Sequence, residues 1–233
     1  MKTNLTLILD AAHGSNVSGK RSPDGMFLEY QFSRKIISIV QEKLSNLDEI
    51  VIVETAPTEL EPGLHDRVRI ANRQASPALF VSVHANAAGS DGKWHDAKGF
   101  EIYTSIGDTP ADDYASAIFE KFVKAFPDFK VRKDTSDGDP DREANFYVLK
   151  NTRMPAVLIE TGFQDNRSDV ETMSDEEFQE LYAQVIAESV IEYAVSVGVD
   201  IKIGYAPEER SPADTSSESP GETGENAKPA QAE

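Results

Sequence analysis

The chain has 233 residues, of which 39% are hydrophobic, and a formal net charge of −18 from 23 basic and 41 acidic side chains. This length and composition suit a single medium-sized α/β domain with one sizeable core. Cysteine is absent, which excludes disulfide scaffolds, thiolate nucleophiles and cysteine-ligated metals, and the strong acidity argues against binding nucleic acid.

Short apolar runs alternate with amphipathic segments along most of the chain. Short, nearly continuous apolar runs are typical of strands that are buried on both faces, whereas apolar residues at intervals of three and four predict helices. In chain order we expect strand Asn4–Asp10, helix Leu28–Ser45, strand Glu49–Glu54, helix His65–Gln74, strand Ala78–Val83, strand Gly99–Thr104, helix Ala111–Phe126, strand Asn145–Leu149, strand Ala156–Glu160 and helix Asp175–Ser196. This alternation predicts a mostly parallel, twisted sheet of about six strands with helices on both faces.

The two ends of the chain differ from this pattern. The first apolar run, Leu5–Leu9, is too short for a signal peptide and is better interpreted as a strand. We therefore expect the chain to be made in the cytoplasm. No run reaches the roughly 18 apolar residues of a membrane span, so membrane insertion is not expected. Residues 206–233 are rich in Pro, Glu, Ser and Thr and lack aromatic side chains. We predict a folded domain over residues 1–205 and a disordered tail over 206–233.

Polar residues follow three of the apolar runs, at the points where the predicted strands end. His13 follows the first run, His84 the third, and Glu160 the last. Ligands of open α/β sheets gather at the carboxyl ends of the strands, so these side chains are expected at one edge of the sheet. A fourth candidate, Glu29, opens the first long helix after a loop rich in Gly, Ser and Pro, which could fold back toward His13.

Two histidines and one carboxylate form a known catalytic zinc set, and a second carboxylate can serve as general base toward the bound water. The four residues His13, Glu29, His84 and Glu160 would supply that set. Each also has a structural interpretation. A strand-end histidine is more often bonded to the backbone, Glu29 suits the first turn of a helix, and Glu160 could pair with Arg142 or Arg153.

Several motifs, in order, resemble the zinc amidases of peptidoglycan in the N-acetylmuramoyl-L-alanine amidase 3 family. The resemblance runs from about Leu5 to Tyr193. It rests on the stretches Leu7-Ile8-Leu9-Asp10-Ala11-Ala12-His13-Gly14, Leu64-His65-Asp66-Arg67 with Ile70-Ala71-Asn72, Val81-Ser82-Val83-His84-Ala85-Asn86, Gly99-Phe100-Glu101-Ile102-Tyr103, and Pro155-Ala156-Val157-Leu158-Ile159-Glu160-Thr161-Gly162-Phe163 with Asn166.

The resemblance implies one zinc ion held by His13, Glu29 and His84, with Glu160 as the catalytic acid and base. One departure is that the family usually has glycine before its first histidine, where this chain has Ala12. That change would matter only if residue 12 required a positive φ.

Two further residues are candidates for substrate binding. Asn86 follows His84 closely and could orient a ligand, although an asparagine after a strand also suits a turn. Glu143 precedes a predicted strand and could line the cleft, although a solvated charged loop is commoner.

The expected function is zinc-dependent hydrolysis of the amide between N-acetylmuramic acid and L-alanine in peptidoglycan. The expected partner is the peptidoglycan of the cell wall. We expect the protein to be a monomer and to act in the manner of an endolysin. Three alternatives remain open: a zinc peptidase that cuts the stem peptide, a wall-binding relative without turnover, and a soluble acidic interaction protein that acts through its tail.

Overall fold

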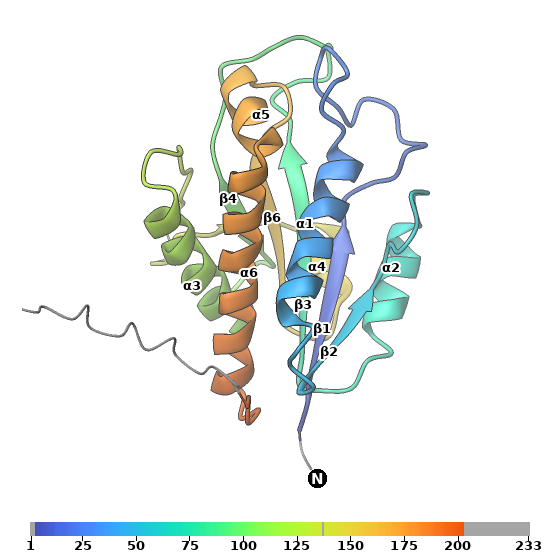
Figure 1. The fold of residues 1–233 in the computed structure, drawn as a ribbon, viewed down its shortest axis with the longest axis vertical. Helices are drawn as coiled ribbons and strands as arrows, with labels where there is room; N and C mark the ends of the chain where they lie inside the picture. The colour runs from blue at the N-terminus through green and yellow to red at the C-terminus, as the bar shows by residue number, and fades with distance from the viewer. Residues whose placement is uncertain (1–2, 137, 203–233) are drawn as a thin grey trace, which may run out of the picture. The chain divides into compact units, whose positions relative to one another are not determined.

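The computed structural model describes residues 3–136 and 138–202, and in these residues a six-stranded sheet carries helices on both faces (Figure 1). The strands are β1 (Leu5–Ala11), β2 (Ile50–Glu54), β3 (Ala78–Asn86), β4 (Glu101–Thr104), β5 (Arg142–Glu143) and β6 (Ala156–Phe163). Their order is β2-β1-β3-β6-β4-β5, and every neighbouring pair is parallel except β4 with β6. The predicted fold class is confirmed.

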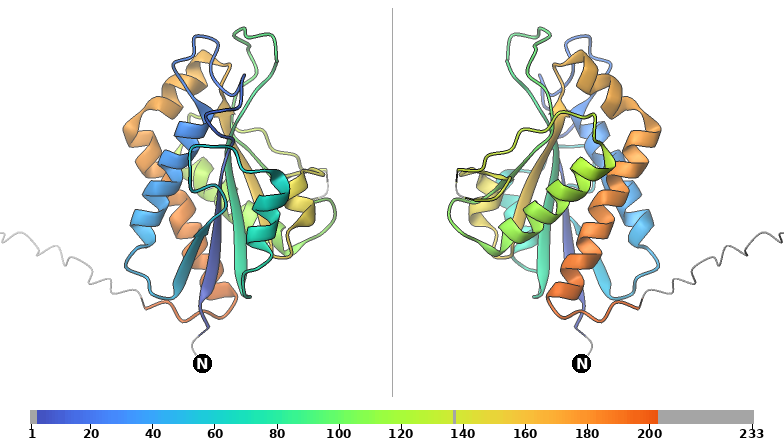
Figure 2. Two further views of the ribbon diagram at one scale, coloured as in Figure 1. Left: turned by 90° about the vertical axis from the view of Figure 1, so that its right-hand side faces the viewer. Right: turned by 90° about the vertical axis from the view of Figure 1, so that its left-hand side faces the viewer.

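The helices divide between the two faces of the sheet, as the two side views show (Figure 2). One face is covered by α1 (Glu29–Leu44), α3 (Pro110–Ala125) and α6 (Glu176–Ser196). The other carries α2 (Leu64–Ala71) and α4 (Tyr147–Asn151), and α5 (Arg167–Ser174) connects β6 to α6.

The core follows from the alternation of side chains along the central strands. Leu5, Leu7 and Leu9 of β1 point into the larger cluster, beneath α1 and α6, whereas Ile8 points into the smaller cluster beneath α2 and α4. Successive strand residues face opposite sides of the sheet. An apolar run without polar interruptions therefore contributes side chains to both clusters. The smaller cluster is covered by two short helices, which leaves the carboxyl ends of the strands open on that face.

The expected strand at Asn145–Leu149 is wrong. This stretch forms the end of a loop followed by α4, in which Val148 and Leu149 are buried against the sheet. A five-residue apolar run lacks the length that separates a strand from a helical turn. The strand next to β4 is instead the two-residue β5. Neither β5 nor helix α5 was predicted from the sequence.

Two neighbouring carboxylates, one of them buried, lie where β5 begins. Asp141 is 2% exposed and accepts a hydrogen bond from Thr104 Oγ1 at 2.8 Å. Burial raises the pKa of Asp141 to about 7, and the adjacent carboxylate of Asp139 adds to the effect against the Thr104 hydrogen bond. The folded state therefore holds a proton that the unfolded chain has already released at pH 5.

We expect Asp141→Asn to stabilise the fold above pH 7 and not at pH 4. A raised carboxyl pKa makes folding stability fall as pH rises from about 4 to about 7, and an amide abolishes that loss while still accepting from Thr104. The expected gain in unfolding free energy above pH 7 is on the order of 2 kcal/mol. Thermal melts at both pH values would test it, and equal shifts at the two would contradict it.

Residues 203–233 lie outside the described residues, and with them the predicted domain boundary at residue 205 and the predicted disorder of 206–233. Among the described helices, none combines the length and the apolar character required to cross a membrane.

Candidate metal centre and active-site hollow

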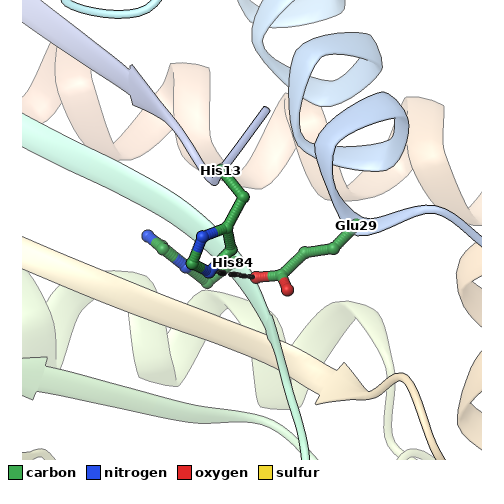
Figure 3. A group of neighbouring side chains, drawn as sticks. All are labelled: His13, Glu29 and His84. Carbon is green, nitrogen blue, oxygen red and sulfur yellow. Dashed lines mark hydrogen bonds and ion pairs between the residues drawn. The ribbon is translucent and has the colours of Figure 1, made fainter. Parts of the chain in front are cut away.

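Three side chains meet at the carboxyl end of the sheet, as the sequence predicts (Figure 3). One ligand atom from each of His13, Glu29 and His84 lies within 4.8 Å of the other two. Glu29 Oε1 is 3.2 Å from His84 Nδ1 and 3.7 Å from His13 Nε2. Glu29 is 1% exposed, and its second oxygen, Oε2, is buried without a hydrogen-bond partner. The group could hold a metal ion.

One buried hydroxyl ties together the three elements that carry these side chains. Ser33, on α1, accepts a hydrogen bond from the backbone N–H of Ala12 at 2.8 Å and donates to the carbonyl of Val83 at 2.7 Å. These two residues directly precede His13 and His84. Glu29 lies one turn before Ser33 on the same helix. The spacing of the three candidate ligands is therefore fixed by hydrogen bonds to the backbone as well as by packing.

The backbone at the end of β1 explains why Ala12 is compatible with this site. Among the described residues, His13 is the one non-glycine residue with a positive φ, at 43°. Ala12 does not have a positive φ and is fully buried, so a methyl group at that position causes no backbone strain. The glycine that the turn requires is Gly14, because a Cβ there would collide with the backbone of Glu61.

The protonation states of His13 and Glu29 favour a cation. Burial lowers the pKa of His13 to about 4 against the attraction of Glu29, so its ring is neutral at pH 7 with a lone pair available. Burial opposes ionisation of Glu29, but the hydrogen bond and charge of His84 outweigh it and lower the pKa of Glu29. In the same way, Glu29 and Glu160 outweigh burial and raise the pKa of His84.

Glu160 lies beside His84 on the neighbouring strand. The two residues are register partners of β6 and β3, and both line the same hollow. Glu160 Oε2 is buried without a hydrogen-bond partner, and Arg142 pairs with Glu101 at 3.0 Å instead. Burial raises the pKa of Glu160 to about 8, opposed by His84 and aided by Glu29.

The hollow has one polar end and one apolar wall. His13, His84 and Glu160 belong to its polar lining. Its wall is formed by side chains of α2, α4 and the residue before α4, among them Leu64, Phe146 and Tyr147, which are 51%, 39% and 41% exposed. Exposed apolar side chains around a polar base are typical of a small-molecule site.

A buried ion-pair network supports the floor of the hollow. Asp10 accepts hydrogen bonds from Arg67 Nη1 at 2.7 Å and from Ser82 Oγ at 2.6 Å, and a further one from Thr55. Arg67 Nη2 pairs with Glu61 at 3.2 Å, and Glu61 Oε1 lies 4.0 Å from His13 Nδ1. Arg67 is 2% exposed, and it also donates hydrogen bonds to the backbone carbonyls of Ala11 and Pro62.

Asn86 and Glu143, the two candidates for substrate binding, do not line this hollow. Asn86 donates a short hydrogen bond to Glu101, and Glu143 accepts one from the backbone of Gly107 at 2.8 Å. Sequence reasoning missed Lys20, Phe146 and Tyr147, which do line it. Lys20 lies in an irregular loop, and the two aromatic residues belong to the segment that was assigned to a strand.

Comparison with known proteins identifies a family for this chain. The sequence model of the N-acetylmuramoyl-L-alanine amidase family matches residues 7–192. The endolysin of Bacillus phage SPP1 is 33% identical over 187 residues, which are 79% of this chain and 64% of that protein. The N-acetylmuramoyl-L-alanine amidase CwlM of Bacillus licheniformis is 28% identical, over 74% of this chain and 62% of its own length. The chain thus spans less than two thirds of the length of these two relatives.

Two solved structures match this chain over nearly their whole length. The N-acetylmuramoyl-L-alanine amidase of Clostridium difficile 630 superposes with a TM-score of 0.74 at 28% identity, covering 84% of this chain and 100% of that one. The catalytic domain of CwlV, an N-acetylmuramoyl-L-alanine amidase of Bacillus (Paenibacillus) polymyxa var. colistinus, gives 0.70 at 31% identity, covering 84% and 99%. Since the family match extends over most of the chain and the candidate ligands fall within it, this protein belongs to the N-acetylmuramoyl-L-alanine amidase family.

Proposed function

We propose that the protein hydrolyses the amide bond between N-acetylmuramic acid and L-alanine in peptidoglycan, with one zinc ion held by His13, Glu29 and His84. The observation that carries the proposal is the convergence of these three side chains, two of which, His13 and His84, line the same hollow as Glu160. Membership of the amidase family indicates which bond is cut, and the residues that line the hollow indicate how it is cut.

The donor set supports zinc as the ion. Two imidazoles and one carboxylate suit Zn²⁺, which in catalytic sites takes three protein ligands and leaves a position open. Glu29 Oε2 is a buried oxygen without a partner, and such an atom is costly unless a proton or a cation satisfies it. When bound, zinc supplies a Lewis acid that lowers the pKa of water toward about 7 and polarises the substrate carbonyl.

Glu160 is the proposed proton carrier. Its carboxylate accepts a proton from the attacking water and returns one to the departing nitrogen of L-alanine. Burial raises the pKa of Glu160 to about 8, and a nearby cation shifts that pKa down again because it favours the charged form. The group can thus both accept and deliver a proton near neutral pH. Leu64, Phe146 and Tyr147 exclude water from one side of the reacting bond.

The products of digestion test this proposal. Purified peptidoglycan fragments are incubated with the protein, with and without a chelator, and the products are identified by mass spectrometry. We expect free stem peptides with an intact N-terminal L-alanine, and none after chelation. Restoring activity with zinc alone would identify the ion.

Two other outcomes would contradict the proposal in different ways. Shortened peptides that are still attached to the sugar would indicate a zinc peptidase. Retention on peptidoglycan with zinc bound but no cleavage would indicate a wall-binding relative without turnover.

A further inference from the structure

Lys20 is placed next to the candidate metal centre by the loop that joins β1 to α1. Its backbone carbonyl accepts a hydrogen bond from the N–H of Glu29 at 3.2 Å. Its side chain lines the same hollow as His13, His84 and Glu160. Its charge also contributes to lowering the pKa of His13. The ammonium group is therefore within electrostatic reach of the reacting bond.

Within the described part of the chain, the Lys20 ammonium forms no hydrogen bond and no ion pair, although the protein carries 41 acidic residues. The other cation that lines the hollow, Arg67, is buried and already paired with Asp10 and Glu61. Lys20 is thus the cation left available to a ligand. Its charge attracts the carboxylates of Glu29 and Glu160 without touching either, and an anionic substrate group would provide the direct contact that the ammonium lacks.

The charge around the site is distributed unevenly. The wall formed by Leu64, Phe146 and Tyr147 is apolar. On the other side, Lys20 also borders a second hollow, whose lining includes two more cations, Arg21 and Lys93, and one carboxylate, Asp165. An elongated substrate with one uncharged and one anionic half would therefore bind with its anionic half toward Lys20.

Peptidoglycan has this asymmetry about the bond that the proposed function cuts. The glycan side is uncharged near the amide, whereas the stem peptide carries carboxylates. The carboxyl group of L-alanine is used in a peptide bond, so the first free carboxylate belongs to the second residue, a γ-linked D-glutamate. In some walls this group is amidated, which removes its charge.

We propose that Lys20 binds the free α-carboxylate of the second stem-peptide residue and so selects unamidated over amidated peptidoglycan. This inference rests on the proposed function. The interaction is a charge-assisted hydrogen bond in a partly desolvated site, and such contacts contribute about a 10- to 100-fold preference. Since Lys20 contacts the stem peptide, which carries the leaving nitrogen, it also orients the substrate with its sugar over α4.

The test pairs two substrates with two proteins. Muramoyl-peptides that differ only in a carboxylate or a carboxamide at residue 2 are hydrolysed by the wild type and by Lys20→Met. We expect the wild type to prefer the carboxylate by about 10- to 100-fold in kcat/KM, and Lys20→Met to lose that preference, mainly through the acidic substrate. Any effect of Lys20 on metal affinity cancels in the ratio. Lys35→Met, which removes an exposed lysine of α1, is the matched control and should keep the preference.

The outcomes distinguish failure of the proposed role of Lys20 from failure of the proposed amidase activity. Equal hydrolysis of both substrates by the wild type, or an unchanged preference in Lys20→Met, would overturn the role of Lys20 and leave the amidase activity standing. Failure of the wild type to release peptide from either substrate would overturn both.

Discussion

Replacing Glu160 with glutamine is expected to lower kcat/KM on muramoyl-peptides by about 10²- to 10⁴-fold while the protein keeps its metal. Glutamine has nearly the same shape as glutamate, but its amide cannot accept the proton of the attacking water. Glu160 borders the candidate ligands without belonging to the group of three that meets within 4.8 Å. The variant should therefore separate proton transfer from metal binding. Released peptide measured by mass spectrometry, beside metal content per chain, tests both halves.

The variant is also expected to fold normally. With a pKa raised to about 8, the metal-free Glu160 carboxyl is mostly protonated at pH 7, so a neutral amide resembles the state that the fold already holds. Glu171→Gln, which alters an exposed glutamate of α5, is the matched control and should retain full activity. If Glu160→Gln kept more than about a tenth of wild-type activity, Glu160 would not be the general base.

The site residues could be named from the sequence because parallel strands end at one edge. His13, His84 and Glu160 each follow an apolar run, and β1, β3 and β6 are consecutive neighbours in the sheet. The order of the three strands in the sheet is enough to bring their side chains together. The position of Glu29 is harder to predict from the sequence, since its approach to His13 depends on how the loop between β1 and α1 folds back. The structure shows that loop bonded to the first N–H of α1 through the carbonyl of Lys20.

The walls of the hollow could not be predicted in the same way. Phe146 and Tyr147 line it because α4 is a single short helix, and five apolar-rich residues do not distinguish a helical turn from a strand. Lys20 lies in an irregular loop, where neither residue type nor spacing fixes the direction of a side chain. The sequence thus indicated the chemistry at the strand ends, whereas the features that would choose the substrate depend on tertiary contacts.

Replacing His84 with alanine is expected to remove the metal and reduce hydrolysis to background. His84 is a proposed ligand, and its Nδ1 is also 3.2 Å from Glu29 Oε1. The change therefore removes one metal ligand and leaves a second, Glu29, as a buried carboxylate whose remaining hydrogen bond comes from the backbone N–H of Ala85 at 3.2 Å. Bound zinc after dialysis should fall from about one ion per chain to nearly none. His65→Ala, which removes an exposed histidine of α2, should keep both zinc and activity.

Thermal unfolding distinguishes loss of the metal from loss of the fold. A ligand present at 100 times its Kd stabilises the folded state by about 2.7 kcal/mol, which is about 5–10 °C in Tm for a domain of this size. The wild type should show a zinc-dependent rise of this order that a chelator reverses, and His84→Ala should show none. Its metal-free Tm is expected to fall as well, since Glu29 loses its hydrogen bond with His84. A zinc-dependent rise that survived in His84→Ala would mean that the ion is held elsewhere, and the ligand set proposed here would have to be abandoned.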